Sequence, residues 1–244
     1  MLNYRRTSVA VGALAMLFGA GSVLAADTGS ITGKVTLKGG QAAAAERKAI
    51  DMAAVKECAD MHKEKKAGYE TEVVSKEGGI RYVMVWIKDG LGEKKFTAPA
   101  EPVELDQEGC VYKPHAFGMM AGQKLLIKNT DPTLHNVHAL PKKNEEFNNP
   151  QPAKGAPIEK TFARTEEPFL VKCDVHPWMG AYCGVFDHPF FAVTDKDGNF
   201  TIKDVPPGEY TIKIWHEVYP PKEVKVSVKT GDTAKADAEL EPKK

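Results

Sequence analysis

Short alternations of apolar and polar residues recur along most of the chain and predict a mostly β protein. The run from Ile31 to Leu37 alternates with period two and ends at a Gly-Gly pair, as a half-buried strand does. Similar runs, rich in strand-forming residues, occupy residues 80–87, 124–128 and 134–140 and are separated by Gly, Pro, Asn and Asp. We therefore expect mainly antiparallel sheets.

Two stretches depart from this alternation. Residues 41–62 are rich in Ala, Glu and Lys and contain neither Gly nor Pro, so they predict the only helix of any length. Residues 141–157 combine several prolines with polar side chains, which predicts a long loop of functional or mobile character.

The first 25 residues have the order of an export signal. Arg5 and Arg6 precede an apolar run from Val9 to Ala20, and small residues follow up to Ala25. This order is typical of a secretory signal cleaved after Ala25, and the apolar run is shorter than the ~20 residues that cross a membrane. The paired arginines leave twin-arginine export open. We expect a periplasmic or otherwise secreted protein with no transmembrane segment in the mature chain.

The charge balance argues against nucleic acid as a partner. The 244 residues contain 33 basic and 33 acidic side chains, so no basic surplus is present to neutralise phosphates. The length suits one large or two small domains. In an exported protein the four cysteines are interpreted first as disulfides and second as metal ligands.

The C-terminal part carries the turn motifs of a known family. Residues 191–194 and 199–202 flank an Asp-Lys-Asp-Gly turn, which predicts a hairpin, and Pro206-Pro207-Gly208 precedes another strand. The segments 194–200 and 205–210 resemble carboxypeptidase regulatory-like domains.

This resemblance implies a small transthyretin-like β-sandwich. In that family a strand with the pattern G-x-V opens the domain, and Gly33-Lys34-Val35 fits it. We therefore expect residues 28–40, and also 80–90, to complete the C-terminal sandwich around an inserted middle domain.

Four residues in the middle of the chain have the chemistry of a copper site. Cys173, His176 and Met179 follow one another at C-x2-H-x2-M spacing, and His135 lies upstream, after Asn-Thr-Asp-Pro. Two imidazoles and a thiolate with a weak axial thioether are the ligands of a mononuclear blue-copper electron-transfer site. Zinc rarely takes a methionine.

This motif resembles that of the cupredoxins, amicyanin and plastocyanin in particular. The loop from Cys173 to Met179 has the spacing of amicyanin, with Pro177 and Trp178 between the histidine and the methionine. The resemblance implies a cupredoxin Greek-key β-sandwich that holds one type 1 copper ion. Its ligands would be His135, Cys173, His176 and Met179.

The resemblance also implies roles for neighbouring residues. Asn136 would hydrogen-bond the two ligand loops together. The edge of His176 would be exposed, and redox-partner proteins would dock near His176, Pro177 and Trp178. Asp174 departs from the family, which often has a small hydroxyl residue there, and this leaves the reduction potential open.

Cys58 and Cys110 form the remaining pair, and each has a histidine nearby, His62 or His115. A disulfide that joins the helical segment to the middle domain is expected, worth about 2–4 kcal/mol. A second metal site made of these two cysteines and two histidines is the alternative. Cys183 is then a buried free thiol in a strand.

Three further histidines are expected to be structural. His138 lies three residues from His135, so the two point to opposite faces of a strand. His188 and His216 lie at strand ends beside Pro189 and Trp215.

The sequence therefore predicts an N-terminal part of strands and helix at 26–98, a cupredoxin domain at 99–187 and a regulatory-like sandwich at 188–244. The expected function is that of a one-electron carrier, not an enzyme. A periplasmic copper-binding or copper-delivery protein is one alternative. A carbohydrate- or protein-binding β-sandwich module that carries a metal site is the other.

Overall fold

The computed structural model describes residues 27–40, 49–69 and 74–242. The expected signal segment and residues 41–48 of the expected helix lie outside this description. The expectation of a mostly β protein is confirmed, and strands β1 to β17 form four sheets. Within the described residues no helix is long and apolar enough to cross a membrane.

The first sandwich combines strands from both ends of the chain. One sheet contains β13 (Asn199–Val205), β1 (Gly29–Leu37), β16 (Thr233–Lys235) and β17 (Ala238–Leu240). The other contains β12 (Phe191–Val193), β2 (Met84–Asp89), β14 (Gly208–Trp215) and β15 (Lys222–Val228). Alternate residues such as Val35, Val85 and Ile212 face inward and form one core. Thus β1 and β2 lie in the C-terminal sandwich, where the resemblance placed residues 28–40 and 80–90.

The hairpin expected around residues 195–198 is wrong in its pairing. The turn itself is present, since Asp195 N–H donates to the carbonyl of Asn199. However, β12 pairs with β2 and β13 pairs with β1, so the turn connects the two sheets of the sandwich. Each strand takes its ladder partner from a different sheet, β2 for β12 and β1 for β13, so the two strands do not pair with each other.

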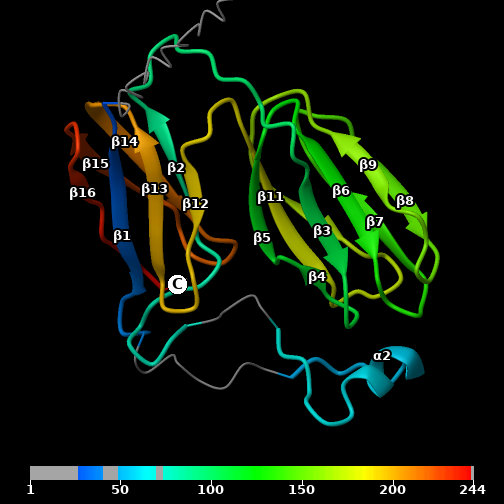
Figure 1. Cartoon of the computed structure of the whole chain (residues 1–244). Helices are drawn as coiled ribbons and strands as arrows, with labels where there is room; N and C mark the ends of the chain where they lie inside the picture. Colours follow the sequence, from blue (N-terminus) through cyan, green and yellow to red (C-terminus); the bar gives the residue numbers. More distant parts are fainter. Residues whose placement is uncertain (1–26, 41–48, 70–73, 243–244) are drawn as a thin grey trace, which may run out of the picture.

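The second sandwich lies beside the first (Figure 1). Its five-stranded sheet contains β5 (Ala116–Met120), β11 (Gly180–Phe186), β10 (Glu166–Lys172), β7 (His135–Ala139) and β8 (Phe147–Gln151). Its four-stranded sheet contains β4 (Tyr112–Lys113), β3 (Val103–Gln107), β6 (Lys124–Asn129) and β9 (Ile158–Thr161). The pairs β3–β6 and β5–β11 are parallel.

The long loop expected at 141–157 contains a strand in the structure. Strand β8 pairs with β7 along residues 147–151 and ends the five-stranded sheet. Pro150 is accommodated because an edge strand does not need every N–H for the ladder. In β8, residues 147–150 alternate between half-buried and exposed, and the strand contains several polar side chains. Its sequence therefore lacks the apolar–polar alternation that predicts a strand.

In its described part, residues 49–62, the expected helical segment is mostly not helical, and it packs against one end of the second sandwich. Within residues 49–62 only α2 (Lys56–Met61) is helical, because Ile50 instead bonds across to Ala67. Ile50, Met52 and Cys58 are buried in the core of the second sandwich. Figure 1 shows this cyan segment below the lower ends of the green strands. We call residues 49–69 the cap.

Candidate metal centre

Strand pairing brings the four expected ligands to one end of the second sandwich. His135 begins β7, while Cys173, His176 and Met179 lie in the loop between β10 and β11. Strands β7 and β10 are antiparallel, with His138 opposite Lys172, so the start of β7 lies beside the loop that follows β10. The loop is closed by hydrogen bonds from Met179 N–H to His176 and from Cys173 N–H to Met179.

Three of the four side chains offer donor atoms to a common point. The Nδ1 atoms of His135 and His176 are 2.8 Å apart, and Cys173 Sγ lies 3.7 Å from His176 Nδ1. One ligand atom from each residue lies within 4.8 Å of the other two. All three residues are buried, as is Met179, so water is largely excluded. Two imidazoles, a thiol and a neighbouring thioether suit copper in both oxidation states.

Asn136 ties the two ligand loops together. Its Oδ1 atom accepts the N–H of Asp174 at 2.7 Å and lies 3.2 Å from Cys173 Sγ. Its Nδ2 atom donates to Asn148 on β8. The resemblance implied this linking role, and these hydrogen bonds have the geometry that it requires.

The surroundings of Cys173 favour its thiolate. Burial raises the pKa of the thiol, but hydrogen bonds from His135, His176 and the backbone outweigh it and lower the pKa to about 6. Because a thiolate is the form that binds metals, the thiol is prepared for coordination at neutral pH.

Asp131 supports His135 from the side away from the thiol. Its Oδ2 atom lies 2.9 Å from His135 Nε2, and the carboxylate is almost fully buried. Burial opposes the charged form of His135, but the hydrogen bond to Asp131 raises the pKa of His135 above its ordinary value. Holding Nε2 as a donor leaves Nδ1 free to bind a metal. The sequence reasoning assigned Asp131 no role, although its place four residues before His135 was visible.

The expected exposure of His176 is wrong. Its side chain is only 1% exposed because the cap covers it. Cys58 and Cys110 form a disulfide, and their sulfurs lie within 4.8 Å of a ring nitrogen of His176. Trp178 is half-buried, and its ring centroid is 5.3 Å from that of His176.

The disulfide also answers the alternative of a second metal site in this structure. With both sulfurs joined, Cys58 and Cys110 offer no thiolate. His62 Nε2 instead donates to the carbonyl of Gly109 at 2.7 Å. His115 lies elsewhere, with its ring nitrogens against Gly180 and Glu217. Cys183 is a buried free thiol, as expected.

The other histidines are engaged away from the centre. His138 contacts Asp174 with one nitrogen and Glu146 with the other. His188 is buried, and its Nε2 donates to the carbonyl of Ile87. His216 is buried against Tyr219, with a distance of 4.8 Å between the ring centroids.

His216 should make stability depend on pH. Its Nε2 has no hydrogen-bond partner among the described residues, and burial lowers its pKa to about 4. In the unfolded chain the pKa of this histidine is near 6.5. The stability that depends on neutral His216 is therefore fully present above pH 6.5 and is lost as the pH falls toward 4. We expect a loss of about 3 kcal/mol over that window. In His216→Gln this part of the slope should vanish; equal slopes in denaturant titrations would contradict the assignment.

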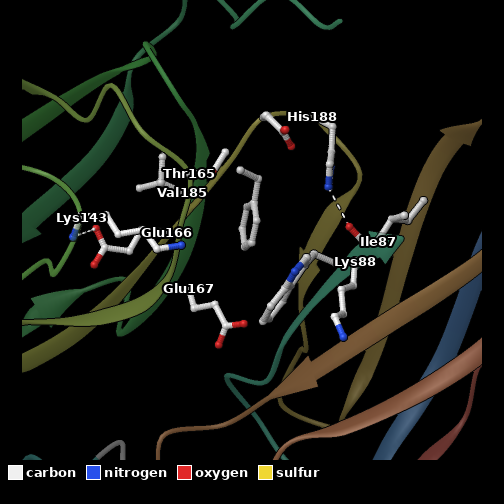
Figure 2. A pocket seen from close by; sticks show the side chains of 11 residues that line it. Ile87, Lys88, Lys143, Thr165, Glu166, Glu167, Val185 and His188 are labelled. Carbon is white, nitrogen blue, oxygen red and sulfur yellow. Dashed lines mark hydrogen bonds between the residues drawn. The ribbon is translucent and has the colours of Figure 1, made fainter. Parts of the chain in front are cut away.

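A separate pocket lies between the two sandwiches and does not offer a comparable set of groups. It has a volume of about 150 Å³, and residues of both sandwiches line it, including Trp86, Glu166 and His188. Figure 2 shows Glu166 turned toward Lys143, whose N–H donates to it, and His188 bonded to Ile87. Glu166 and His188 are therefore already hydrogen-bonded within the protein.

Comparisons with known proteins found one family-model match and a set of similar solved structures. Residues 187–241 match the family model of the carboxypeptidase regulatory-like domain. No curated protein sequence matches the chain. The solved structures to which the chain is similar include cupredoxins.

Three of these structures illustrate the range. A copper-containing nitrite reductase from Thermus scotoductus SA-01 has 18% identity and a TM-score of 0.34 over 39% of this chain and 26% of its own. A purple cupredoxin from Nitrosopumilus maritimus has 19% identity and a TM-score of 0.29 over 34% of this chain and 98% of its own. A mutant amicyanin in its Cu(I) form has 18% identity and a TM-score of 0.32 over 41% of this chain and 97% of its own.

Proposed function

We propose that this chain is an exported mononuclear blue-copper protein that carries single electrons between redox partners. The observation that carries the proposal is the convergence of His135 Nδ1, His176 Nδ1 and Cys173 Sγ in a buried site. His135, Cys173, His176 and Met179 would hold the metal. Copper bound there would supply one-electron chemistry by alternating between Cu(I) and Cu(II).

The protein's own residues would keep the ligands in place during this cycle. Asn136 fixes the loop of Cys173 against β7 through hydrogen bonds to Oδ1. Burial keeps water away from the donor atoms. A ligand set that is held this firmly rearranges little when an electron arrives or leaves, which favours rapid transfer.

Because His176 is buried, a redox partner cannot contact it directly, and docking has to involve its neighbours. Pro177 is exposed and Trp178 is half-buried, and the Trp178 ring lies next to that of His176. We therefore propose that redox partners dock near Pro177 and Trp178. The electron would move between the partner and the metal site through Trp178 and His176.

We propose electron transfer without substrate turnover. Each group of three or more metal-binding side chains found among the described residues includes His135 or His176. An enzyme with a second catalytic copper would need a separate set of ligands, and these groups all belong to one end of one sandwich.

Copper delivery is the second candidate, because a buried cysteine and methionine also suit Cu(I) storage. The two readings differ in a measurable way. A carrier should exchange electrons rapidly and retain its copper against a Cu(I) chelator. A delivery protein should give up Cu(I) to the chelator, and redox cycling should be dispensable.

The test of the copper site is the Cys173→Ser variant, with Cys183→Ala as the matched control. Wild type and control, loaded with one equivalent of Cu(II), should show an intense visible thiolate-to-copper band and a narrow copper hyperfine splitting. Cys173→Ser should lose both while its circular dichroism stays unchanged. An intense band that persists in Cys173→Ser would refute the ligand assignment.

A further inference from the structure

Cys110 contacts the carboxylate that supports one metal-binding histidine. The N–H groups of Gly109 and Cys110 each donate to Asp131, at 2.7 Å. The oxygen that accepts from Cys110 is the same Oδ2 atom that faces His135 Nε2 at 2.9 Å. Asp131 is only 2% exposed, so water cannot replace these hydrogen-bond partners. The backbone of Cys110 therefore sets the direction of the carboxylate, and the carboxylate sets the ring of His135.

Cys110 also lies close to the second histidine, His176, and bonds the side chain that packs against it. The carbonyl of Cys110 accepts the indole N–H of Trp178 at 2.9 Å. The Trp178 ring lies against the His176 ring, and the disulfide sulfurs lie within 4.8 Å of a His176 ring nitrogen. Cys110 thus bonds both Asp131, which contacts His135, and Trp178, which contacts His176.

The conformation of Cys110 is one that needs to be held. Its φ is +53°, in the left-handed region that a non-glycine residue rarely adopts. Such a backbone conformation is strained and persists only where its surroundings fix it. Here the fixing groups are the disulfide to Cys58, the carboxylate of Asp131 and the indole of Trp178.

We propose that Cys110, fixed by its disulfide to Cys58, is a positioning residue of the metal centre, orienting His135 through Asp131 and His176 through Trp178. The inference rests on the proposed copper site. A carboxylate that accepts the imidazole N–H fixes the tautomer and makes the ring a stronger donor. Because a stronger nitrogen donor favours Cu(II) over Cu(I), loss of this support should raise the reduction potential.

The first experiment compares wild type with the double variant Cys58→Ala/Cys110→Ala, with Cys183→Ala as the control for loss of a buried sulfur. Cu(II) affinity is measured by competition with a chelator, and the reduction potential by redox titration. We expect the double variant to bind Cu(II) 10- to 100-fold more weakly and to show a raised potential. The control should match wild type.

A second variant, Asp131→Asn, keeps the disulfide and serves if the double variant does not fold. It should weaken Cu(II) binding and raise the potential in the same direction. In the metal-free protein, NMR should detect a slowly exchanging Nε2 proton of His135 in wild type. This proton should exchange at least tenfold faster in either variant, a change that simple destabilisation of another region would not cause.

The outcomes separate this inference from the proposed function. Absence of the thiolate-to-copper band in wild type would refute the copper site itself. Suppose instead that the band is present. The positioning role would be overturned if both variants bound Cu(II) within twofold of wild type and had reduction potentials equal to that of wild type within error. An effect in Asp131→Asn alone would overturn the role of the disulfide.

Discussion

Removal of the Cys58–Cys110 disulfide should lower the free energy of unfolding of the metal-free protein by about 4 kcal/mol. The bond spans 52 residues, so its loss lets the unfolded chain explore many more conformations. The disulfide also fixes the cap to the second sandwich, where the cap residues Ile50 and Met52 are buried. The loss is a large share of the 5–15 kcal/mol that is typical of folded domains.

The measurement is denaturant unfolding of the Cys58→Ala/Cys110→Ala variant, followed by circular dichroism and tryptophan fluorescence. Cys183→Ala is again the matched control, because Cys183 is a buried free thiol in β11 of the same sandwich. A chemical reductant should lower the stability of wild type and of the control but leave the double variant unchanged. A difference below about 1 kcal/mol between wild type and double variant would mean that the cap contributes little.

The candidate ligands could be recognised in the sequence because the information that points to them is local. Cys173, His176 and Met179 belong to one short loop, and their residue types alone restrict the metal. His135 required only that β7 and β10 be neighbouring strands, and they pair in the five-stranded sheet. The inward positions of β1, such as Ile31 and Val35, also follow directly from their period of two.

What the sequence did not predict depends on contacts between distant segments. The cover over His176 comes from the cap, and the one sequence feature that indicated a contact between these segments was the expected pairing of Cys58 with Cys110. The turn at Asp195–Gly198 has the same local sequence whether it joins strands of one sheet or of two. Pairing of β1 with β13 decides between them, and β1 lies at the other end of the chain.

The role of Asp131 was missed for a related reason. An acidic residue in an Asn-Thr-Asp-Pro turn is ordinarily explained by the turn itself. Its carboxylate becomes important only when the N–H groups of Gly109 and Cys110 and the ring of His135 surround it. A buried carboxylate with three such donors is visible in the fold and in no sequence pattern.

Copper binding should itself stabilise the fold, and two histidines of the same strand allow a matched test. At a free copper concentration 1,000 times the dissociation constant, the free energy of unfolding should rise by about 4 kcal/mol. His135→Gln removes a proposed ligand, so at the same concentration the gain should fall below about 1 kcal/mol. His138→Gln should keep the full gain, because the His138 nitrogens contact Asp174 and Glu146.

Thermal or denaturant unfolding with and without copper measures these differences in the disulfide-intact protein. The two variants change the same residue type in β7, only three positions apart, so a general loss of strand stability would affect both. Metal held by His138 with Asp174 and Glu146 would instead be lost in His138→Gln and kept in His135→Gln. Equal stabilisation of the two variants would place the bound copper away from Cys173 and leave the buried cluster without a metal.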